Sequence, residues 1–190
     1  MLVICAIALL LSPAHSEQQN TKFCFMGTRD LMDAAAPRFD QYPAGAEPSA
    51  TVAKLDLHSN PIARTFPTVI RRQMRQGANF AGHYRVAIWG CGSSCAQFAV
   101  VDLKTGRAIT PRAVESVSGG RLAADDFLPG TDSDEWGFRY KKNSRLLVLL
   151  GTLNEDDSKQ GAFYYLVSGD KLQLIHKTIA ASNTCQEGPD

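Results

Sequence analysis

Hydrophobic and polar residues alternate along much of the chain, which is the pattern of β-strands that bury one face. Tyr84, Val86 and Ile88 fall on one face of such a strand, whereas residues 146–150 are apolar at every position, as in a strand covered on both faces. Short polar turns separate these stretches. We predict strands over residues 83–89, 97–102, 107–110, 136–140, 145–150, 162–167 and 172–177.

These strands form two similar groups. Segments 83–110 and 136–177 each look like an antiparallel meander, with blade-like hairpins joined by a loop over 111–134. Two such groups are too few to close a propeller. We therefore predict a mainly β fold (α+β with a minor helix), in which antiparallel meanders form a curled sheet or a two-sheet sandwich.

A helical period occurs over residues 65–76. Thr65 is the predicted cap, Pro67 lies in the first turn, and Gly77 is a suitable stop. The apolar positions share one face: Phe66, Val69, Ile70 and Met74. Three arginines lie elsewhere: Arg71, Arg72 and Arg75. This basic side is either a solvated face or a contact for an acidic partner.

Residues 1–16 predict a secretory signal peptide, because they are uncharged and apolar up to Ser12 and end in small residues before Glu17. The run is shorter than the ~20 residues of a membrane span. We predict cleavage after Ser16, a periplasmic or secreted location, and no membrane span after cleavage. An irregular N-terminal segment over 17–59 then precedes a β-rich domain over 60–190.

The composition indicates a folded chain, since 44% of the residues are hydrophobic and 21% are charged. The net charge is only +1. A chain with so little excess charge produces no strong attraction for nucleic acid, so we expect no nucleic-acid partner.

Cleavage removes Cys5 and leaves four cysteines, an even number that predicts disulfides in an exported chain. Cys91 and Cys95 are close together on a glycine-rich turn, and Cys24 and Cys185 lie near the two ends of the mature chain. We predict the pairs Cys91–Cys95 and Cys24–Cys185. The second pair would tie the irregular N-terminal segment to the domain.

Other chemistry fits the residues less well. A redox or metal-dependent enzyme centred on Cys91, Cys95 and His83 is the alternative, but C-x₃-C on a hairpin lacks the helix N-terminus that activates redox cysteines, and the His-x₇-Cys spacing matches no familiar zinc pattern. The acidic stretch 122–136 leaves an irregular calcium loop open. No catalytic set emerges, and we expect no cofactor and no metal.

The second face of the first predicted strand carries His83, Arg85 and Trp89. An uncovered surface with these side chains is a candidate binding surface, because Trp and Arg are enriched at binding hot spots. The alternative is that this face packs under the helix or under a second sheet.

The most distinctive motif is Asn79-Phe80-Ala81-Gly82-His83-Tyr84, followed by W-G-C-G-x-x-C over 89–95 and D-x-K-T-G over 102–106. These motifs resemble a family of small exported bacterial proteins, over roughly residues 64–110. The resemblance supports export and the β-rich fold and transfers no catalytic residue. We expect an exported, disulfide-stabilised, non-enzymatic binding or accessory protein of the bacterial envelope, with an envelope or extracellular protein as its partner.

Overall fold

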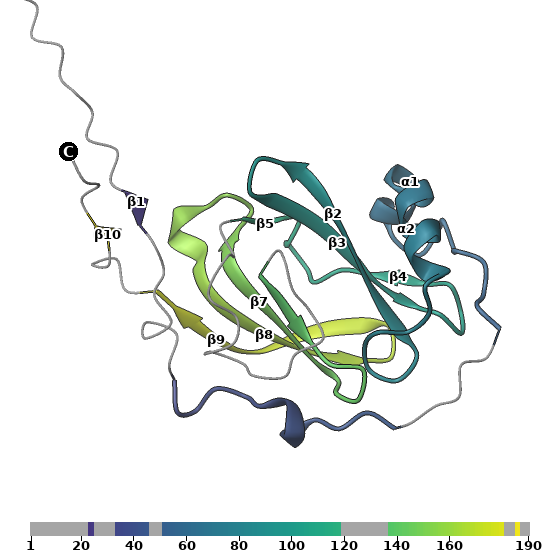
Figure 1. The fold of residues 1–190 in the computed structure, drawn as a ribbon, viewed down its shortest axis with the longest axis horizontal. Coiled ribbons are helices and arrows are strands. Elements are labelled where there is room, and N and C mark those ends of the chain that lie inside the picture. The colour runs from purple at the N-terminus through teal and green to yellow at the C-terminus, as the bar shows by residue number, and fades with distance from the viewer. Residues whose placement is uncertain (1–22, 25–32, 46–50, 119–136, 181–184, 187–190) are drawn as a thin grey trace, which may run out of the picture.

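The strands build one open, antiparallel sheet (Figure 1) in a computed structural model that describes residues 23–24, 33–45, 51–118, 137–180 and 185–186. The strand order is β2-β3-β5-β7-β8-β9, with β4 paired to β3 and β6 paired to β7. The strands are β2 (Tyr84–Gly92), β3 (Cys95–Asp102), β4 (Ala108–Ile109), β5 (Val117–Ser118), β6 (Phe138–Tyr140), β7 (Leu146–Leu153), β8 (Gln160–Ser168) and β9 (Lys171–Ile179). The mainly β, antiparallel prediction is therefore confirmed, as a single curled sheet and not as a sandwich of two sheets.

The predicted signal peptide over 1–16 and the acidic stretch over 122–136 lie outside the described residues. Within the described ranges, no helix has the length and apolar character needed to cross a membrane. The predicted loop over 111–134 contains one strand that the sequence pattern did not indicate, the two-residue β5.

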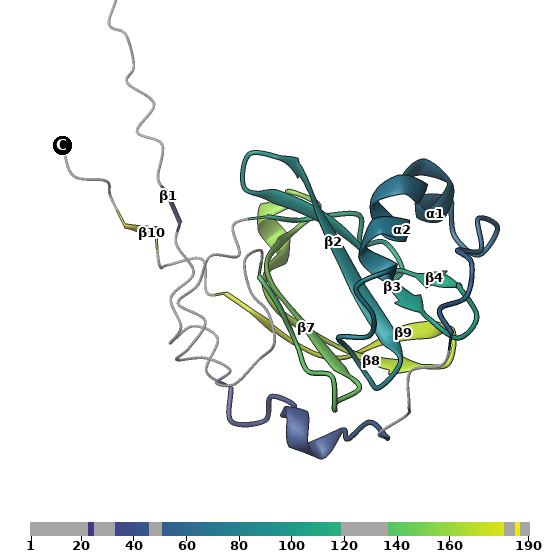
Figure 2. The ribbon, with the colours of Figure 1, turned by 45° about the vertical axis from the view of Figure 1, so that its right-hand side comes forward.

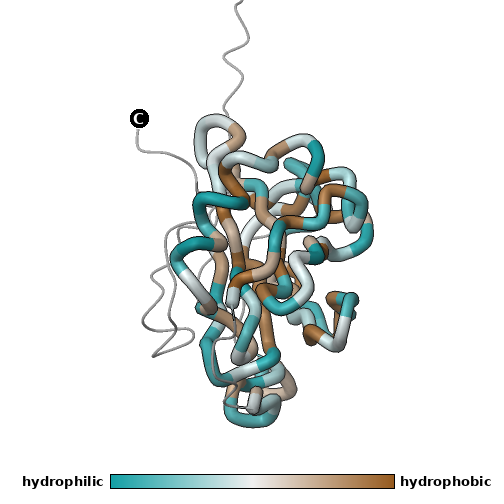
Figure 3. The backbone as a smooth tube through the Cα atoms, turned by 90° about the vertical axis from the view of Figure 1, so that its right-hand side faces the viewer, coloured by the Kyte–Doolittle hydropathy of each residue, from teal (hydrophilic) through white to brown (hydrophobic). Residues whose placement is uncertain are grey.

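Alternation along the strands places one set of side chains inside the curl of the sheet. Tyr84 and Val86 of β2 meet residues of β3, β7 and β8 in the largest core cluster. Figure 3 shows apolar positions, in brown, alternating with polar positions along the chain. Strand β7 is buried at every position, as predicted, because its odd residues face this core and Leu146, Val148 and Leu150 face the outer side.

Two helices cover the outer face of β3: α1 (Pro61–Thr65) and α2 (Pro67–Met74). Figure 2 shows them beside β2 and β3. Ile70 and Met74 pack against Ala99 and Val101 there. The prediction of one helix capped by Thr65 is wrong. Pro67 disfavours helical backbone in the residue before it, so Phe66 leaves the helical region and divides the segment in two.

The true first cap is Asn60, whose side chain accepts a hydrogen bond from the Ile62 N–H, 3.0 Å away. Thr65 instead donates its hydroxyl to the Pro61 carbonyl within α1. Gly77 follows α2 with a φ of +80°, in the left-handed region expected of a helix stop.

Residues 33–45 cover the outer face of β7 and β8, with a short 3₁₀ helix, η2 (Phe39–Gln41), in their middle. Phe39 packs against Leu146, Val148 and Tyr164. The buried Ser144 hydroxyl bonds the carbonyls of Phe39 and Tyr42, at 2.9 and 3.0 Å. This part of the predicted irregular segment is thus coil that is fixed to the sheet.

The curl of the sheet brings β2, the first strand, close to the β8–β9 hairpin. The Tyr84 hydroxyl, on β2, donates a 2.9 Å hydrogen bond to the Gly169 carbonyl in the turn between β8 and β9. A separate pair of short strands, β1 (Phe23–Cys24) and β10 (Cys185–Gln186), is antiparallel, with Cys24 opposite Cys185. That register is compatible with the Cys24–Cys185 disulfide, which stays a prediction.

Candidate functional site

The motif residues that stand out in the sequence converge at one end of the sheet. His83 precedes β2 and Asp102 ends β3, and antiparallel pairing of Tyr84 with Asp102 brings them together. His83 Nε2 lies 3.5 Å from Asp102 Oδ1, with both side chains largely buried. The His83 ring also stacks on Tyr84, with 4.3 Å between the ring centroids. Burial, helped by the negative charges of Asp102 and Asp170, raises the pKa of Tyr84 and keeps its hydroxyl a donor to Gly169.

Asp102 is occupied by the turn that it begins. Its Oδ1 accepts a 2.8 Å hydrogen bond from the Lys104 N–H, and its Oδ2 accepts one from the Thr105 hydroxyl, also at 2.8 Å. Such bonds are the mechanism by which Asp fixes tight turns. The carboxylate therefore orders the D-x-K-T-G turn and positions His83 at the same time.

Gly106 completes this turn for a steric reason. Its φ is +76°, and a Cβ placed on it would lie 1.8 Å from the Lys54 carbonyl oxygen. Its own carbonyl accepts a 2.8 Å hydrogen bond from the Asp56 N–H. Only a glycine allows the segment before α1 to lie this close to the turn.

Asn79 closes the outer edge of β2, the first strand of the sheet. Its side-chain oxygen accepts a 2.8 Å hydrogen bond from the Val86 N–H, and its nitrogen donates to the Val86 carbonyl and to the Tyr140 hydroxyl, at 3.3 and 3.1 Å. Gln73 of α2 does the same for the N–H and the carbonyl of Ile88. The side-chain amides of Asn79 and Gln73 thus satisfy backbone groups of β2 that would otherwise be free to pair with a strand of another chain.

The predicted candidate binding surface lies beside these contacts and is engaged within the fold. Trp89 packs on Phe66 with 5.1 Å between ring centroids and donates its indole N–H to Gln97. The Arg85 guanidinium donates to Gln76 and to the Gly77 carbonyl, and burial lowers its pKa. Helix α2 packs on this strand and leaves Arg85 and Trp89 half-buried, so the helix covers part of this face, and its use as a binding surface stays a prediction.

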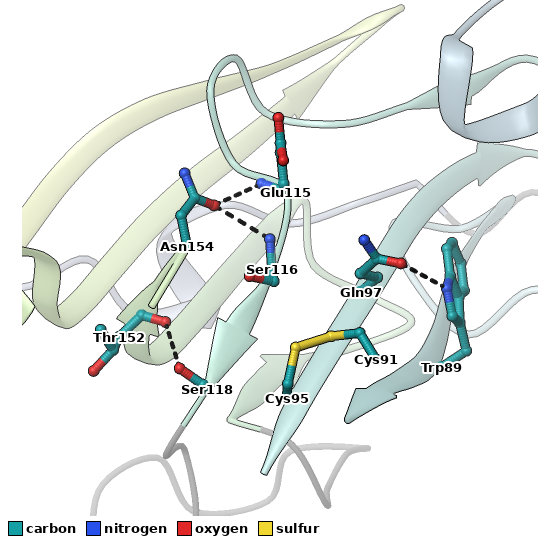
Figure 4. Close-up of a disulfide and its surroundings, with 9 residues drawn as sticks. All are labelled: Trp89, Cys91, Cys95, Gln97, Glu115, Ser116, Ser118, Thr152 and Asn154. Atoms are coloured by element: carbon teal, nitrogen blue, oxygen red, sulfur yellow. Dashed lines mark hydrogen bonds between the residues drawn. A yellow bond between two sulfur atoms is a disulfide. The ribbon is translucent and has the colours of Figure 1, made fainter. Parts of the chain in front are cut away.

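Cys91 and Cys95 form the disulfide that the sequence predicts (Figure 4). It joins β2 to β3 at the end of their hairpin, where Gly92 pairs with Cys95. Cys91 and the turn after it are exposed, whereas the Cys95 side chain is buried. The disulfide therefore closes the projecting end of the β2–β3 hairpin.

His83 and this disulfide lie at opposite ends of β2. At about 3.3 Å per residue, the eight residue steps from His83 to Cys91 span about 26 Å. A zinc ligand lies about 2.0–2.3 Å from its metal, so these side chains cannot share one ion. Within the described part of the chain, no three His, Cys, Asp or Glu side chains are grouped so that they could hold a metal.

A second polar cluster joins Asp33 to β9, and the sequence analysis did not find it. His176 Nε2 lies 2.7 Å from Asp33 Oδ2, and the Thr178 hydroxyl is 3.4 Å from the same oxygen. In a catalytic triad the acid and the hydroxyl contact different ring nitrogens of the histidine. Here Thr178 is 3.5 Å from Nε2, the nitrogen that Asp33 already contacts. The cluster fastens the N-terminal segment to the sheet, and a sequence separation of 143 residues leaves no local signal for it.

Shallow grooves lie on the helical side of the molecule. One, of about 300 Å³, is lined by residues 65–69 and Arg72. Another, of about 380 Å³, lies between residues 52–55 and the end of α2. Neither groove is lined by His83, Cys91 or Cys95.

Comparison with protein-family models, with curated proteins and with solved structures finds no match to this chain. The resemblance to a family of small exported proteins therefore stays a prediction from the motifs, and the interpretation of the site rests on its own geometry.

Proposed function

We propose that this chain is an exported, disulfide-stabilised binding or accessory protein of the bacterial envelope, and that it acts by contact and not by catalysis. The observation that carries the proposal is the use of the motif residues. Asn79, His83, Tyr84 and Asp102 each have hydrogen bonds or close contacts that hold the fold together. These side chains stabilise the scaffold, so we place the function on the surface of that scaffold.

The disulfide supports the export part of the proposal. Disulfides persist in oxidising compartments such as the periplasm and are rare in the cytosol. Cys91 is exposed at the end of a hairpin, where a cytosolic reductant would reach it. Together with the apolar leader over residues 1–16, this supports a periplasmic or secreted location.

The competing enzyme hypothesis requires His83 to act with Cys91 and Cys95. The separation of about 26 Å along β2 argues against a shared centre, and the contact with Asp102 holds the imidazole at the far end of the strand from the disulfide. A redox protein that uses the Cys91–Cys95 disulfide alone can be told apart from the proposed binding protein. It would contain two reactive thiols, those of Cys91 and Cys95, after isolation from its compartment.

The test is to express the full chain in a bacterium and to measure its intact mass and free thiols after cell fractionation. We expect the periplasmic or secreted fraction to contain a chain that begins at Glu17, with no thiol that iodoacetamide alkylates before reduction and four that it alkylates afterwards. A variant without residues 1–16 is the matched control and should stay in the cytosol with reduced cysteines. Free thiols at Cys91 and Cys95, or a metal retained by the exported chain, would contradict the proposal.

A further inference from the structure

The positive charge of the chain is concentrated before β2. Residues 51–82 carry five basic residues and one acidic residue, a net +4, within a chain whose overall net charge is +1. The five are Lys54, Arg64, Arg71, Arg72 and Arg75. The single acid, Asp56, lies 3.9 Å from Arg107. The helical side of the molecule is therefore strongly basic while the remainder of the chain is slightly acidic.

These five basic side chains are exposed, and none has an acidic partner in the part of the chain that the structure describes. Arg71 and Arg75 are four residues apart, the spacing at which like charges repel on a helix. The helix dipole favours cations in the last turn of α2, which stabilises Arg71 and Arg72. It does not account for Lys54, which approaches the same place from a different segment.

Three of these residues line one groove from two sides. Lys54 belongs to the extended segment 52–55, and Arg71 and Arg75 belong to the end of α2. Apolar side chains line the groove between them: Val52, Leu55 and Met74. We call this set of six residues the basic groove. Leu55 and Met74 are buried residues of the core, whereas Val52 is 38% exposed.

The extended side of the basic groove is held in place by backbone hydrogen bonds. The Ala53 N–H donates to the Leu103 carbonyl at 2.9 Å, and the Asp56 N–H donates to the Gly106 carbonyl at 2.8 Å. The D-x-K-T-G turn, which Asp102 orders, thus also positions Lys54. A preformed site of this kind avoids part of the ordering cost of binding.

We propose, as an extension of the binding function above, that the basic groove binds an extended segment of a partner protein in which acidic side chains flank an apolar one. Carboxylates form bidentate hydrogen bonds with arginine, and two arginines and a lysine surround the groove. The volume of about 380 Å³ accommodates an apolar side chain, which would contact mainly Val52, because Leu55 and Met74 are only 7% and 3% exposed.

Two other anionic partners fit the basic groove less well. A membrane surface would require exposed apolar side chains that insert, but within α2 Ile70 and Met74 are buried, at 0% and 3% exposure, and Val69 is partly buried. A polysaccharide or nucleic acid would use the positive charge alone, and the apolar floor would contribute nothing. The combination of floor and rim therefore favours a peptide.

The experiment measures fluorescence anisotropy of a labelled peptide in which glutamates flank a single leucine. Two matched peptides carry glutamine in place of glutamate, or glycine in place of leucine. We expect the mature, oxidised protein to bind the first peptide, and both replacements to weaken binding. Arg71→Glu with Arg75→Glu should weaken it by at least about tenfold, since each reversal turns an attraction into a repulsion. Added salt should weaken it as well.

The control variant is Arg112→Glu with Lys171→Glu, which makes the same change in net charge at exposed positions that do not line the groove. It should bind within about twofold of the unmodified protein. Lys54→Glu, on the side of the groove that is not helical, provides a second variant should the first lose its fold by circular dichroism. Weaker binding by Lys54→Glu with an unchanged fold would support the proposal.

Equal binding by the charge-reversed and unmodified proteins would overturn the inference, as would equal binding of the glutamine peptide. Tight binding of heparin or of anionic vesicles, with no dependence on leucine, would assign the groove to another class of partner and overturn it too. None of these outcomes alters the thiol count, so failure of this inference is distinguishable from failure of the proposed function.

Discussion

The strands at the two ends of the strand order, β2 and β9, have outer edges that are protected in different ways. On the edge of β2, Asn79 and Gln73 satisfy the outward N–H and carbonyl groups of Val86 and Ile88. On β9, no backbone hydrogen bond from another described segment reaches the outer edge. That strand instead contains a bulge at Ile175 and two exposed lysines, Lys171 and Lys177. Bulges and lysines are both devices that discourage edge-to-edge pairing.

The difference shows that pairing of an exposed strand edge with another chain can be prevented in two ways: by residues of the strand itself, or by side chains from other elements. The protection of β9 is built into its own nine residues and survives small movements of the neighbours. The protection of β2 depends on side chains that must arrive from α2 and from the turn after it. Removing one of these amides should therefore cost more than removing a contact at β9.

The largest effect is expected for Asn79→Ala. The substitution leaves the Val86 N–H and carbonyl without their partner, and Val86 is only 1% exposed. The free energy of unfolding, measured by urea denaturation, should fall by about 2–4 kcal/mol because buried unsatisfied polar groups are costly. Asn79→Asp, which keeps the acceptor and loses the donor, should lose less. A loss below about 0.5 kcal/mol, typical of surface changes, would show that the edge of β2 does not need this amide.

Gln73→Ala should have an intermediate effect. It removes the partner of the Ile88 N–H and carbonyl, but Ile88 is half-buried and water can replace part of the lost contact. We expect a loss of about 1–2 kcal/mol in the same denaturation measurement. Arg72→Ala, one residue earlier and exposed, is the control and should change stability by less than about 0.5 kcal/mol. If Gln73→Ala lowered the free energy of unfolding by more than Asn79→Ala, the burial of Val86 and Ile88 would not explain the relative importance of the two amides.

The smallest effect is expected at β9, for Asp33→Asn. A hydrogen bond from the Ala35 N–H, followed by the contact with His176, lowers the pKa of Asp33 in the folded chain. A lowered folded pKa means that the carboxylate stabilises the fold above its ordinary pKa and that this stability is lost as the pH falls. The melting temperatures of the two proteins should therefore differ near neutral pH and converge below about pH 4. A difference that persisted to pH 2.5 would contradict a charge-based contact.

Much of the sheet is predictable because each strand carries its own period. Tyr84, Val86 and Ile88 face the core as the alternation indicates, and the continuous apolar run of β7 is covered on both sides. The two-residue β5 has no period of its own and is fixed by pairing with β3 and β7. The division of the helical segment into two helices could have been predicted from the sequence, because Asn60-Pro61 is one helix start signal and Pro67 is a second.

The site was predictable only where the contact is local. Cys91 and Cys95 are four residues apart, and a hairpin brings them within bonding distance. The contact of His83 with Asp102 requires the exact register of β2 and β3. The contact of Asp33 with His176 requires the path of the entire chain. The packing of α2 on Arg85 and Trp89 likewise depends on how the helix docks on β2. The hydrophobic period of the helix and that of the strand do not reveal this docking.

The hydrogen bond from Tyr84 to Gly169 spans 85 residues of sequence. A contact of this kind cannot form until the β8–β9 hairpin exists, so the curl of the sheet closes last. Folding rates decrease as contacting residues become more distant in sequence, and sheets with such contacts fold over about milliseconds to seconds. A nascent chain of this protein would thus stay open until nearly all of its strands have been synthesised, and during that interval the inner, apolar face of the sheet is exposed to solvent.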